Sequence, residues 1–190
     1  MTVTKALSVI TLLLALSACS SFINITRNEP IVDDKSERSL GEIIDDEVIE
    51  TKALVNLRET SPELDQAHLV VVSYNGTVLL AGQVASKDIV QQAGAIVRSL
   101  GEVQTLHNQL TAEPALGFGT RTNDTWITSK LKTQMLADGA IDGGNIKVVT
   151  ENSTVYLLGL INREMATKAV DLARNTSGVK RVVKIFEYID

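Results

Sequence analysis

Few residues in this sequence have side chains suited to catalysis or metal binding. His68 and His107 are the only two histidines, and Cys19 is the only cysteine in 190 residues. Neither histidine stands at a spacing typical of a metal site, and there is no second thiol. The acidic run at residues 45–47 lacks the spacing of a calcium loop, so we interpret it as negative charge at a helix N-terminus. No nucleophile elbow, phosphate-binding loop or pair of catalytic carboxylates is present, and we expect neither enzymatic activity, a metal nor a cofactor.

The single cysteine follows a segment with the features of an export signal. Lys5 precedes an apolar run over residues 6–16, and small residues close the segment. This pattern predicts a secretory signal peptide over residues 1–18, and the apolar run is too short to span a bilayer. Cys19 cannot form an internal disulfide, and a free thiol is a liability in an oxidising compartment. A modified cysteine is therefore favoured over a chance one.

The stretch "LSAC" at residues 16–19 resembles the lipobox of bacterial lipoproteins. The resemblance implies cleavage before Cys19, which then carries a diacylglycerol thioether and an N-acyl chain. Several acyl chains, each contributing about 0.8 kcal/mol per buried methylene, form a lasting membrane anchor. Ser20 stands where an aspartate would resemble the signal for inner-membrane retention, so we expect the outer membrane, on its periplasmic side. Residues 19–39 are polar and predict a lipidated, flexible tether.

The rest of the chain contains one pattern twice. "VVVSYNGTVLLAGQV" begins at residue 70, and "KVVTENSTVYLLGLI" begins at residue 147. Each stretch is preceded by an amphipathic helical segment and followed by a second one, so the repeating unit is about 65 to 70 residues, one small domain. We therefore expect a first domain over residues 40–112, a linker over 113–121 and a second domain over 122–190.

Within each unit the pattern predicts the order α-β-β-α-β. The apolar residues of the first helix recur at a spacing of four, which is typical of a buried helix face. They are Ile49, Ala53 and Leu57 in the first unit and Ile127, Leu131 and Met135 in the second. Asn75-Gly76 is a strong hairpin signal, because both residues tolerate positive φ, and Asn152-Ser153 is a weaker one. The helical connection to the last strand favours parallel pairing, so the expected fold class is α+β, with a three-stranded mixed sheet and two packed helices in each domain.

Several of these motifs together resemble the BON domain. They are the strand pattern V-x-L-x-G-x-V at residues 78–84 and 155–161 and the ending "SGVKRV" at 177–182. Signal, lipobox, tether and two copies, with the stretch "NDTWIT" at 123–128, resemble the family of outer-membrane lipoproteins with two BON domains. The resemblance covers nearly the whole mature chain. It implies a non-enzymatic protein that binds anionic phospholipid through its second domain, supports outer-membrane integrity and concentrates at the division site.

Gly82 and Gly159 occupy equivalent strand positions in the two units. A glycine inside a strand indicates a bulge or the close approach of another part of the backbone. We interpret both as structural residues that leave room for the packed helix, in preference to a direct role in binding a ligand.

Charge is divided unequally between the two halves of the mature chain. Residues 19–117 carry 7 basic and 15 acidic residues, whereas residues 118–190 carry 10 basic and 8 acidic ones. A basic balance favours an anionic partner, and for an exported protein without a recognition motif that partner is anionic lipid rather than nucleic acid. The alternative is that the small positive excess is ordinary surface scatter.

The only tryptophan, Trp126, lies in the helix predicted at residues 123–135. The helical period places it away from the core face, in company with polar residues. These are Thr122, Ser129 and Thr133 on the outer face and Lys130 on its flank. The exposed ring has two explanations: packing against the other domain or the linker near Phe118, or insertion at a membrane interface, where indole is favoured.

The family resemblance favours the membrane over domain packing. Trp126 and the four polar residues around it are then the predicted phospholipid-binding residues, with Lys130 near a phosphate. Phosphatidylglycerol and cardiolipin are the expected lipids. The alternative function is a periplasmic scaffold or adaptor whose domains bind another envelope protein, which the acidic first half and the long tether would suit.

Overall fold

The computed structural model describes residues 38–189 of the 190-residue chain. The predicted signal peptide at 1–18, the anchor residue Cys19 and nearly all of the predicted tether at 19–39 lie outside the described residues. Their assignment rests on the sequence alone.

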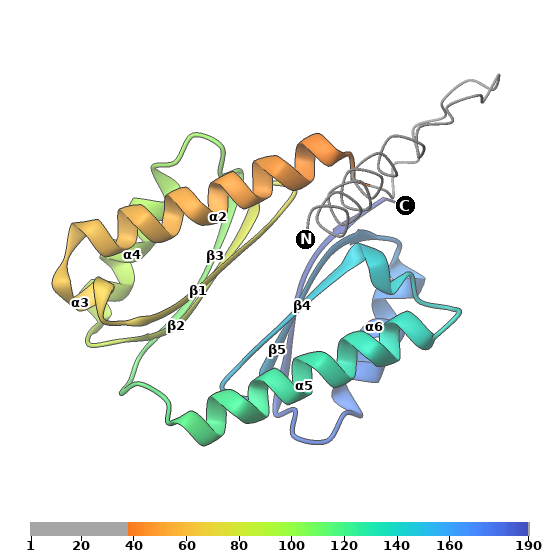
Figure 1. The fold of residues 1–190 in the computed structure, drawn as a ribbon. Helices are drawn as coiled ribbons and strands as arrows, with labels where there is room; N and C mark the ends of the chain where they lie inside the picture. The colour runs from red at the N-terminus through yellow and green to blue at the C-terminus, as the bar shows by residue number, and fades with distance from the viewer. Residues whose placement is uncertain (1–37, 190) are drawn as a thin grey trace, which may run out of the picture. The chain divides into compact units, whose positions relative to one another are not determined.

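The first domain begins with a long helix that packs on a three-stranded sheet (Figure 1). Ser39 caps this helix by accepting a hydrogen bond from the Glu42 N–H, while Glu42 accepts one from the Ser39 N–H, a reciprocal capping box. The elements are α2 (Leu40–Thr60), α3 (Pro62–Asp65), β1 (His68–Tyr74), β2 (Thr77–Val84), α4 (Lys87–Arg98) and β3 (Thr105–Ala112). The short helix α3, capped by Ser61, was not expected from the sequence.

The second domain repeats this order after a short connection. Its elements are α5 (Phe118–Ala137), η2 (Gly143–Asn145), β4 (Ile146–Glu151), β5 (Thr154–Ile161), α6 (Arg163–Arg174) and β6 (Arg181–Tyr188). In each sheet the first two strands pair antiparallel and the second and third pair parallel, in the orders β1-β2-β3 and β4-β5-β6. The prediction of two α+β units with mixed three-stranded sheets is confirmed.

Each hairpin turn is held by a buried aspartate from the long helix. The turn residues have positive φ in both domains: 52° at Asn75 and 72° at Gly76, 50° at Asn152 and 58° at Ser153. Asp46 accepts hydrogen bonds from the Asn75 N–H at 2.8 Å and the Gly76 N–H at 3.0 Å. Asp124 accepts from the Asn152 N–H at 2.8 Å and the Ser153 N–H at 2.9 Å.

This contact corrects our interpretation of the acidic run at residues 45–47. Asp46 lies well inside α2 and is only 2% exposed, so it anchors the turn rather than neutralising the helix N-terminus. Burial opposes its ionisation, but hydrogen bonds from Ser73, Gly76 and Asn75 and the charge of Arg38 outweigh burial and lower the pKa of Asp46.

The strand glycines make room for backbone, not for a helix. A Cβ at Gly82 would stand 1.9 Å from the His68 carbonyl oxygen, and one at Gly159 would stand 2.5 Å from the Asn145 carbonyl oxygen. Both carbonyls belong to the chain entering the neighbouring strand. Our expectation that these glycines accommodate the packed helix was therefore wrong, because the close approach occurs within the sheet; Gly82 also has a φ of 127°.

Each sheet is covered by its two helices on one face, and the opposite faces of the two sheets share a third apolar cluster. The buried members of this cluster are Tyr74, Leu79, Ala81, Tyr156, Leu158 and Ile185. They come from both domains, so the two sheets pack face to face.

Polar contacts at the edges of this cluster join the two domains. Lys147 of β4 donates to Glu50 of α2 at 2.7 Å and to the Ser73 carbonyl at 3.2 Å. Glu187 of β6 accepts from Asn75 at 3.1 Å and from the Thr77 hydroxyl at 2.6 Å. Together with the apolar cluster, these contacts fix the sheet-facing side of each domain and leave the helices outermost.

Candidate functional site

The candidate site is the outward face of α5, a helix of 20 residues. The helix begins earlier than the sequence suggested, because Gly117 is extended, with φ −69° and ψ 159°, and its carbonyl accepts from the Thr120 and Arg121 N–H groups. Residues 118–121, which we had placed in the linker, therefore form the first turn of α5. The two nearby glycines made this segment resemble a linker in the sequence.

The inner face of α5 attaches the helix to the second domain. Ile127, Leu131 and Met135 are at most 1% exposed and belong to the core of that domain, as the spacing predicted. Asp124, on the same side, is 4% exposed and holds the hairpin turn. These contacts fix the rotation of the helix, and the rotation determines which side chains face outward.

Large apolar side chains occupy the opposite face. Trp126 is 53% exposed, Phe118 is 86% exposed and Leu136 is 62% exposed. From the sequence we named only polar neighbours of Trp126 on this face, but the longer helix places Phe118 and Leu136 on the same side. The spacing of four from Phe118 through Thr122 to Trp126 was the signal that could have revealed this.

Trp126 has one close neighbour that bears on its chemistry. The Lys130 ammonium lies over the indole ring, 4.8 Å from its centroid, which is within the range of a cation–π contact. The ring belongs to none of the apolar clusters in the described part of the chain. Its exposure does not support the alternative in which Trp126 packs against the other domain.

The hydroxyl residues of this face bond to their own helix. Thr122, Ser129 and Thr133 each donate to the carbonyl four residues earlier, at 3.0, 2.9 and 2.9 Å. Their protons are therefore already engaged, and their oxygens remain acceptors. Because these donors need no water, covering this face costs less desolvation than free hydroxyl groups would.

The charges of α5 favour an anionic partner. Arg121, Lys130 and Lys132 flank the outward face, and the only acidic residue of the helix, Asp124, is buried on the inner side. A negatively charged surface that approaches this face meets three cations and no exposed carboxylate of α5.

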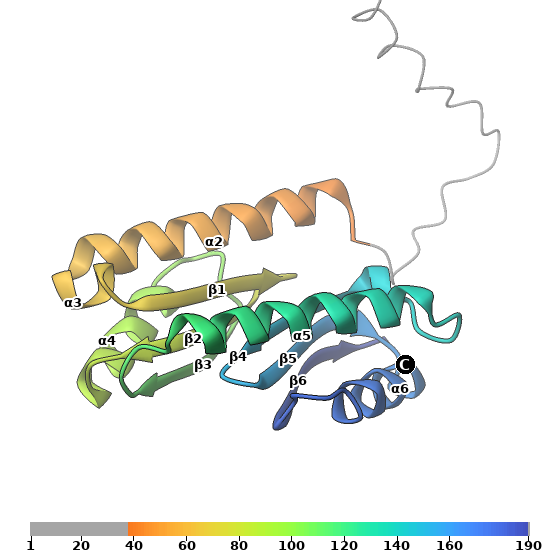
Figure 2. The same ribbon diagram turned by 60° about the horizontal axis from the view of Figure 1, so that its bottom comes forward.

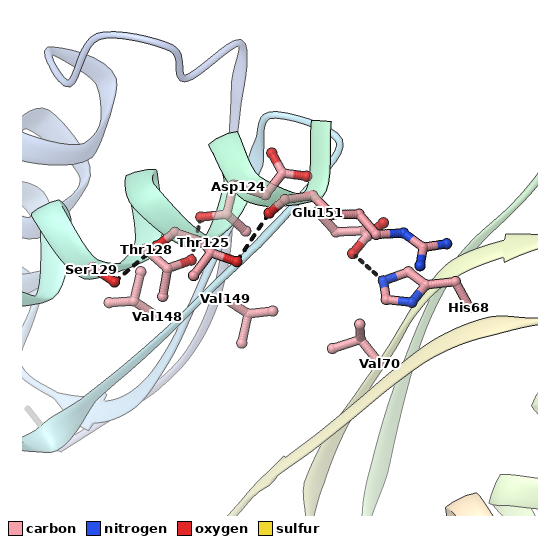
Figure 3. Close-up of a pocket in the computed structure, with 11 residues that line it drawn as sticks. His68, Val70, Asp124, Thr125, Thr128, Ser129, Val148, Val149 and Glu151 are labelled. Carbon is pink, nitrogen blue, oxygen red and sulfur yellow. Dashed lines mark hydrogen bonds and ion pairs between the residues drawn. The ribbon is translucent and has the colours of Figure 1, made fainter. Parts of the chain in front are cut away.

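A cavity of about 320 Å³ lies beside α5, between β1 and β4 (Figure 3). Four of its polar side chains are paired with each other, and Glu151 is also paired with Gln83 of β2. Glu151 accepts from Gln83 at 2.7 Å and lies 3.2 Å from the His68 ring nitrogen, and the Thr128 hydroxyl donates to Thr150 at 2.8 Å. These bonds join α5 to β4 and join β4 to the first sheet, so the arrangement supports a structural role.

The described residues contain no group of three or more histidine, cysteine or acidic side chains that could hold a metal ion. His107 is on β3, and burial lowers the pKa of its ring. None of the helices in residues 38–189 combines the length and apolar character needed to cross a membrane.

Comparison with known proteins identifies the two domains. The model of the BON domain matches residues 45–114 and 123–190. The outer membrane lipoprotein DolP of Haemophilus influenzae is 37% identical over 80% of this chain and 79% of its own length. The 21 kDa hemolysin of Actinobacillus pleuropneumoniae is 34% identical over 80% of this chain and 78% of its own.

A third relative is more distant. The osmotically-inducible protein Y of Escherichia coli is 25% identical over 78% of this chain and 75% of its own length. The fold defines a protein of two BON domains (Figure 2), and the chain belongs to the BON-domain family, in the group of two-domain proteins that includes DolP.

Proposed function

We propose that this protein is anchored by lipid in the outer membrane, faces the periplasm and binds anionic phospholipid through the outward face of α5. The single observation that carries the proposal is the exposed Trp126, set between Phe118 and Leu136 on a helix face without an exposed carboxylate. We further propose that its function is binding and not catalysis.

The apolar residues supply most of the binding free energy. Full burial of one large apolar side chain contributes about 1.5–3 kcal/mol, so covering the exposed fractions of Phe118, Trp126 and Leu136 contributes roughly 3–6 kcal/mol. Each cation near an anionic surface adds about 1 kcal/mol, reduced by salt. Loss of translational and rotational freedom offsets about 4 kcal/mol or more, so α5 alone binds weakly.

The proposed anchor makes this weak contact effective. Acyl chains on Cys19 would hold the domain close to the bilayer, so α5 would meet lipid as an intramolecular partner at high effective concentration. Within the site, Lys130 would leave the indole face to meet a phosphate, while the ring enters the headgroup region, where an amphipathic ring is favoured. Thr122, Ser129 and Thr133 would permit close approach, since small side chains protrude little.

The test is co-sedimentation of the non-acylated mature chain with vesicles that contain phosphatidylglycerol or cardiolipin. Trp126→Glu should abolish binding and leave the fold intact, because the ring lies off the core face. Asn56→Glu is the matched control, since Asn56 is exposed on α2 among polar neighbours and receives the same charge. Equal binding by the Trp126→Glu and wild-type proteins would refute the proposal.

The proposed cellular role is support of outer-membrane integrity, with concentration at the division site. If both depend on lipid contact through α5, cells with the Trp126→Glu protein should lose outer-membrane integrity and the protein should no longer concentrate at the division site. The second candidate, a scaffold for another envelope protein, is favoured by the exposed apolar residues of α2. A scaffold that contacts lipid only incidentally should keep its cellular role in the Trp126→Glu protein.

A further inference from the structure

The first domain also exposes an apolar helix face that its own fold does not use. On α2, Ile44 is 61% exposed, Val55 is 52% exposed and Val48 is 41% exposed. Leu40 and Ile43 extend the same face toward the helix N-terminus, at 79% and 38% exposure. We call these five residues the α2 stripe. A contiguous stripe of large aliphatic side chains on the outside of a small domain marks an interaction surface.

Charge restricts what can cover the α2 stripe. Helix α2 contains six acidic and two basic residues, a net charge of −4, and Asp45 and Glu47 stand beside the stripe. Helix α5 contains three basic residues and one acidic residue, a net charge of +2. An anionic bilayer repels α2, and two α2 helices from separate copies repel each other. The outward face of α5 complements the α2 stripe in charge and in apolar character, because it is cationic and carries exposed apolar residues of its own.

We propose that the α2 stripe of one copy of this protein docks against the outward face of α5 in a second copy. Glu47 and Asp45 then face the cations that flank α5, and Ile44 and Val48 cover the exposed indole and phenyl rings. The two surfaces differ, so the contact is heterologous and leaves one free α2 stripe and one free α5 face in every pair. Successive copies can therefore add to form short chains.

The contact is weak and competes with lipid. One helix pair buries less than the roughly 1,200 Å² of a stable interface, so association depends on the high local concentration of anchored copies. The α5 face cannot hold a second copy and a bilayer at the same time. Anionic lipid therefore releases neighbouring copies, and crowding of copies releases α5 from lipid.

Disulfide trapping in cells tests this with the full chain. One copy carries Thr51→Cys at the middle of α2, and a second, differently tagged copy carries Ser129→Cys at the middle of α5. Central positions meet whether the helices run parallel or antiparallel. We expect a mixed dimer between the two tags, at a yield at least fivefold above that with Thr167→Cys on α6 in place of Ser129→Cys. The wild-type chain gives the background from Cys19.

Asymmetric second substitutions make the test specific. Ile44→Glu should abolish the mixed dimer when placed in the Thr51→Cys copy and leave it unchanged when placed in the Ser129→Cys copy. Trp126→Glu should show the reverse. Asn56→Glu, which adds the same charge to α2 off the stripe, should leave the yield unchanged. A variant that merely unfolds would lose the dimer in both placements.

Three results would overturn the proposal. The first is a yield of mixed dimer no higher than with Thr167→Cys. The second is a disulfide between two Thr51→Cys copies that forms as readily as the mixed one. The third is a mixed dimer that Ile44→Glu abolishes in whichever copy it is placed. The inference does not require lipid binding by α5. Mixed dimers without vesicle binding would refute the proposed function alone, and vesicle binding without mixed dimers would refute this inference alone.

Discussion

Asp46→Ala should be among the most damaging single substitutions in the first domain. Its carboxylate accepts from the Ser73 hydroxyl at 2.6 Å, the Asn75 N–H at 2.8 Å and the Gly76 N–H at 3.0 Å. The bonds from Ser73 and Gly76 are fully buried, and each buried donor left without a partner costs about 1–3 kcal/mol, so the free energy of unfolding should fall by about 2–6 kcal/mol. That is a large part of the roughly 5–15 kcal/mol that stabilises a typical domain.

Urea unfolding followed by circular dichroism measures this effect. At a slope of about 2 kcal/mol per M, the midpoint should fall by roughly 1–3 M. Asp45→Ala is the matched control, because the neighbouring Asp45 is exposed and its substitution should change stability by less than about 0.5 kcal/mol. Equal midpoints for the two variants would show that the turn does not depend on Asp46.

The same residue should give a distinct pH dependence. Because the pKa of Asp46 is lowered in the folded protein, its contribution is fully present above the unfolded value of about 3.9 and is lost as pH falls through the folded pKa. The stability difference between wild type and Asp46→Asn should therefore narrow on acidification below that unfolded value. If the stability difference between the two proteins stays constant as pH falls, Asp46 does not stabilise the fold as a charged carboxylate.

Two further substitutions test the fold that positions α5. Gly82→Ala should lower the free energy of unfolding by about 3–5 kcal/mol, because the added Cβ would meet the His68 carbonyl and because the φ of Gly82 is positive. Gly101→Ala is the control, since Gly101 has open space around it and its substitution should be nearly neutral. Thermal unfolding of the two variants measures the difference. Glu187→Ala removes the acceptor for Asn75 and Thr77 of the other domain and should cost about 1–3 kcal/mol, and a single unchanged unfolding transition would contradict its role in joining the domains.

The regular elements could be predicted because their signals are local. Ile127, Leu131 and Met135 share one helix face by spacing alone, and Asn75-Gly76 specifies a turn by its tolerance of positive φ. The carbonyl that fills the space beside Gly82 comes from His68, fourteen residues away in sequence. Which atoms approach Gly82 could therefore be known only from the pairing of β1 with β2.

The candidate site was only partly predictable for the same reason. The outward direction of Trp126 followed from the helical period, but the start of α5 depends on Gly117, which caps without a side chain and which, with Gly119, made this segment resemble a linker. The cation–π contact with Lys130 is a choice of rotamer, and the hydrogen bonds of the outer hydroxyl groups require the finished helix. The α2 stripe was not predicted, because only the core-facing residues of that helix, Ile49, Ala53 and Leu57, were considered.

The central claim, that α5 meets anionic lipid through its outward face, is tested most directly by the fluorescence of Trp126, since it is the only tryptophan in the chain. Emission of the non-acylated mature chain should shift to the blue when phosphatidylglycerol or cardiolipin vesicles are added, and much less with neutral vesicles, because the indole moves from water into the headgroup region. An unchanged spectrum at a lipid concentration where the protein fully co-sediments would show that another surface binds the membrane, and would contradict the account.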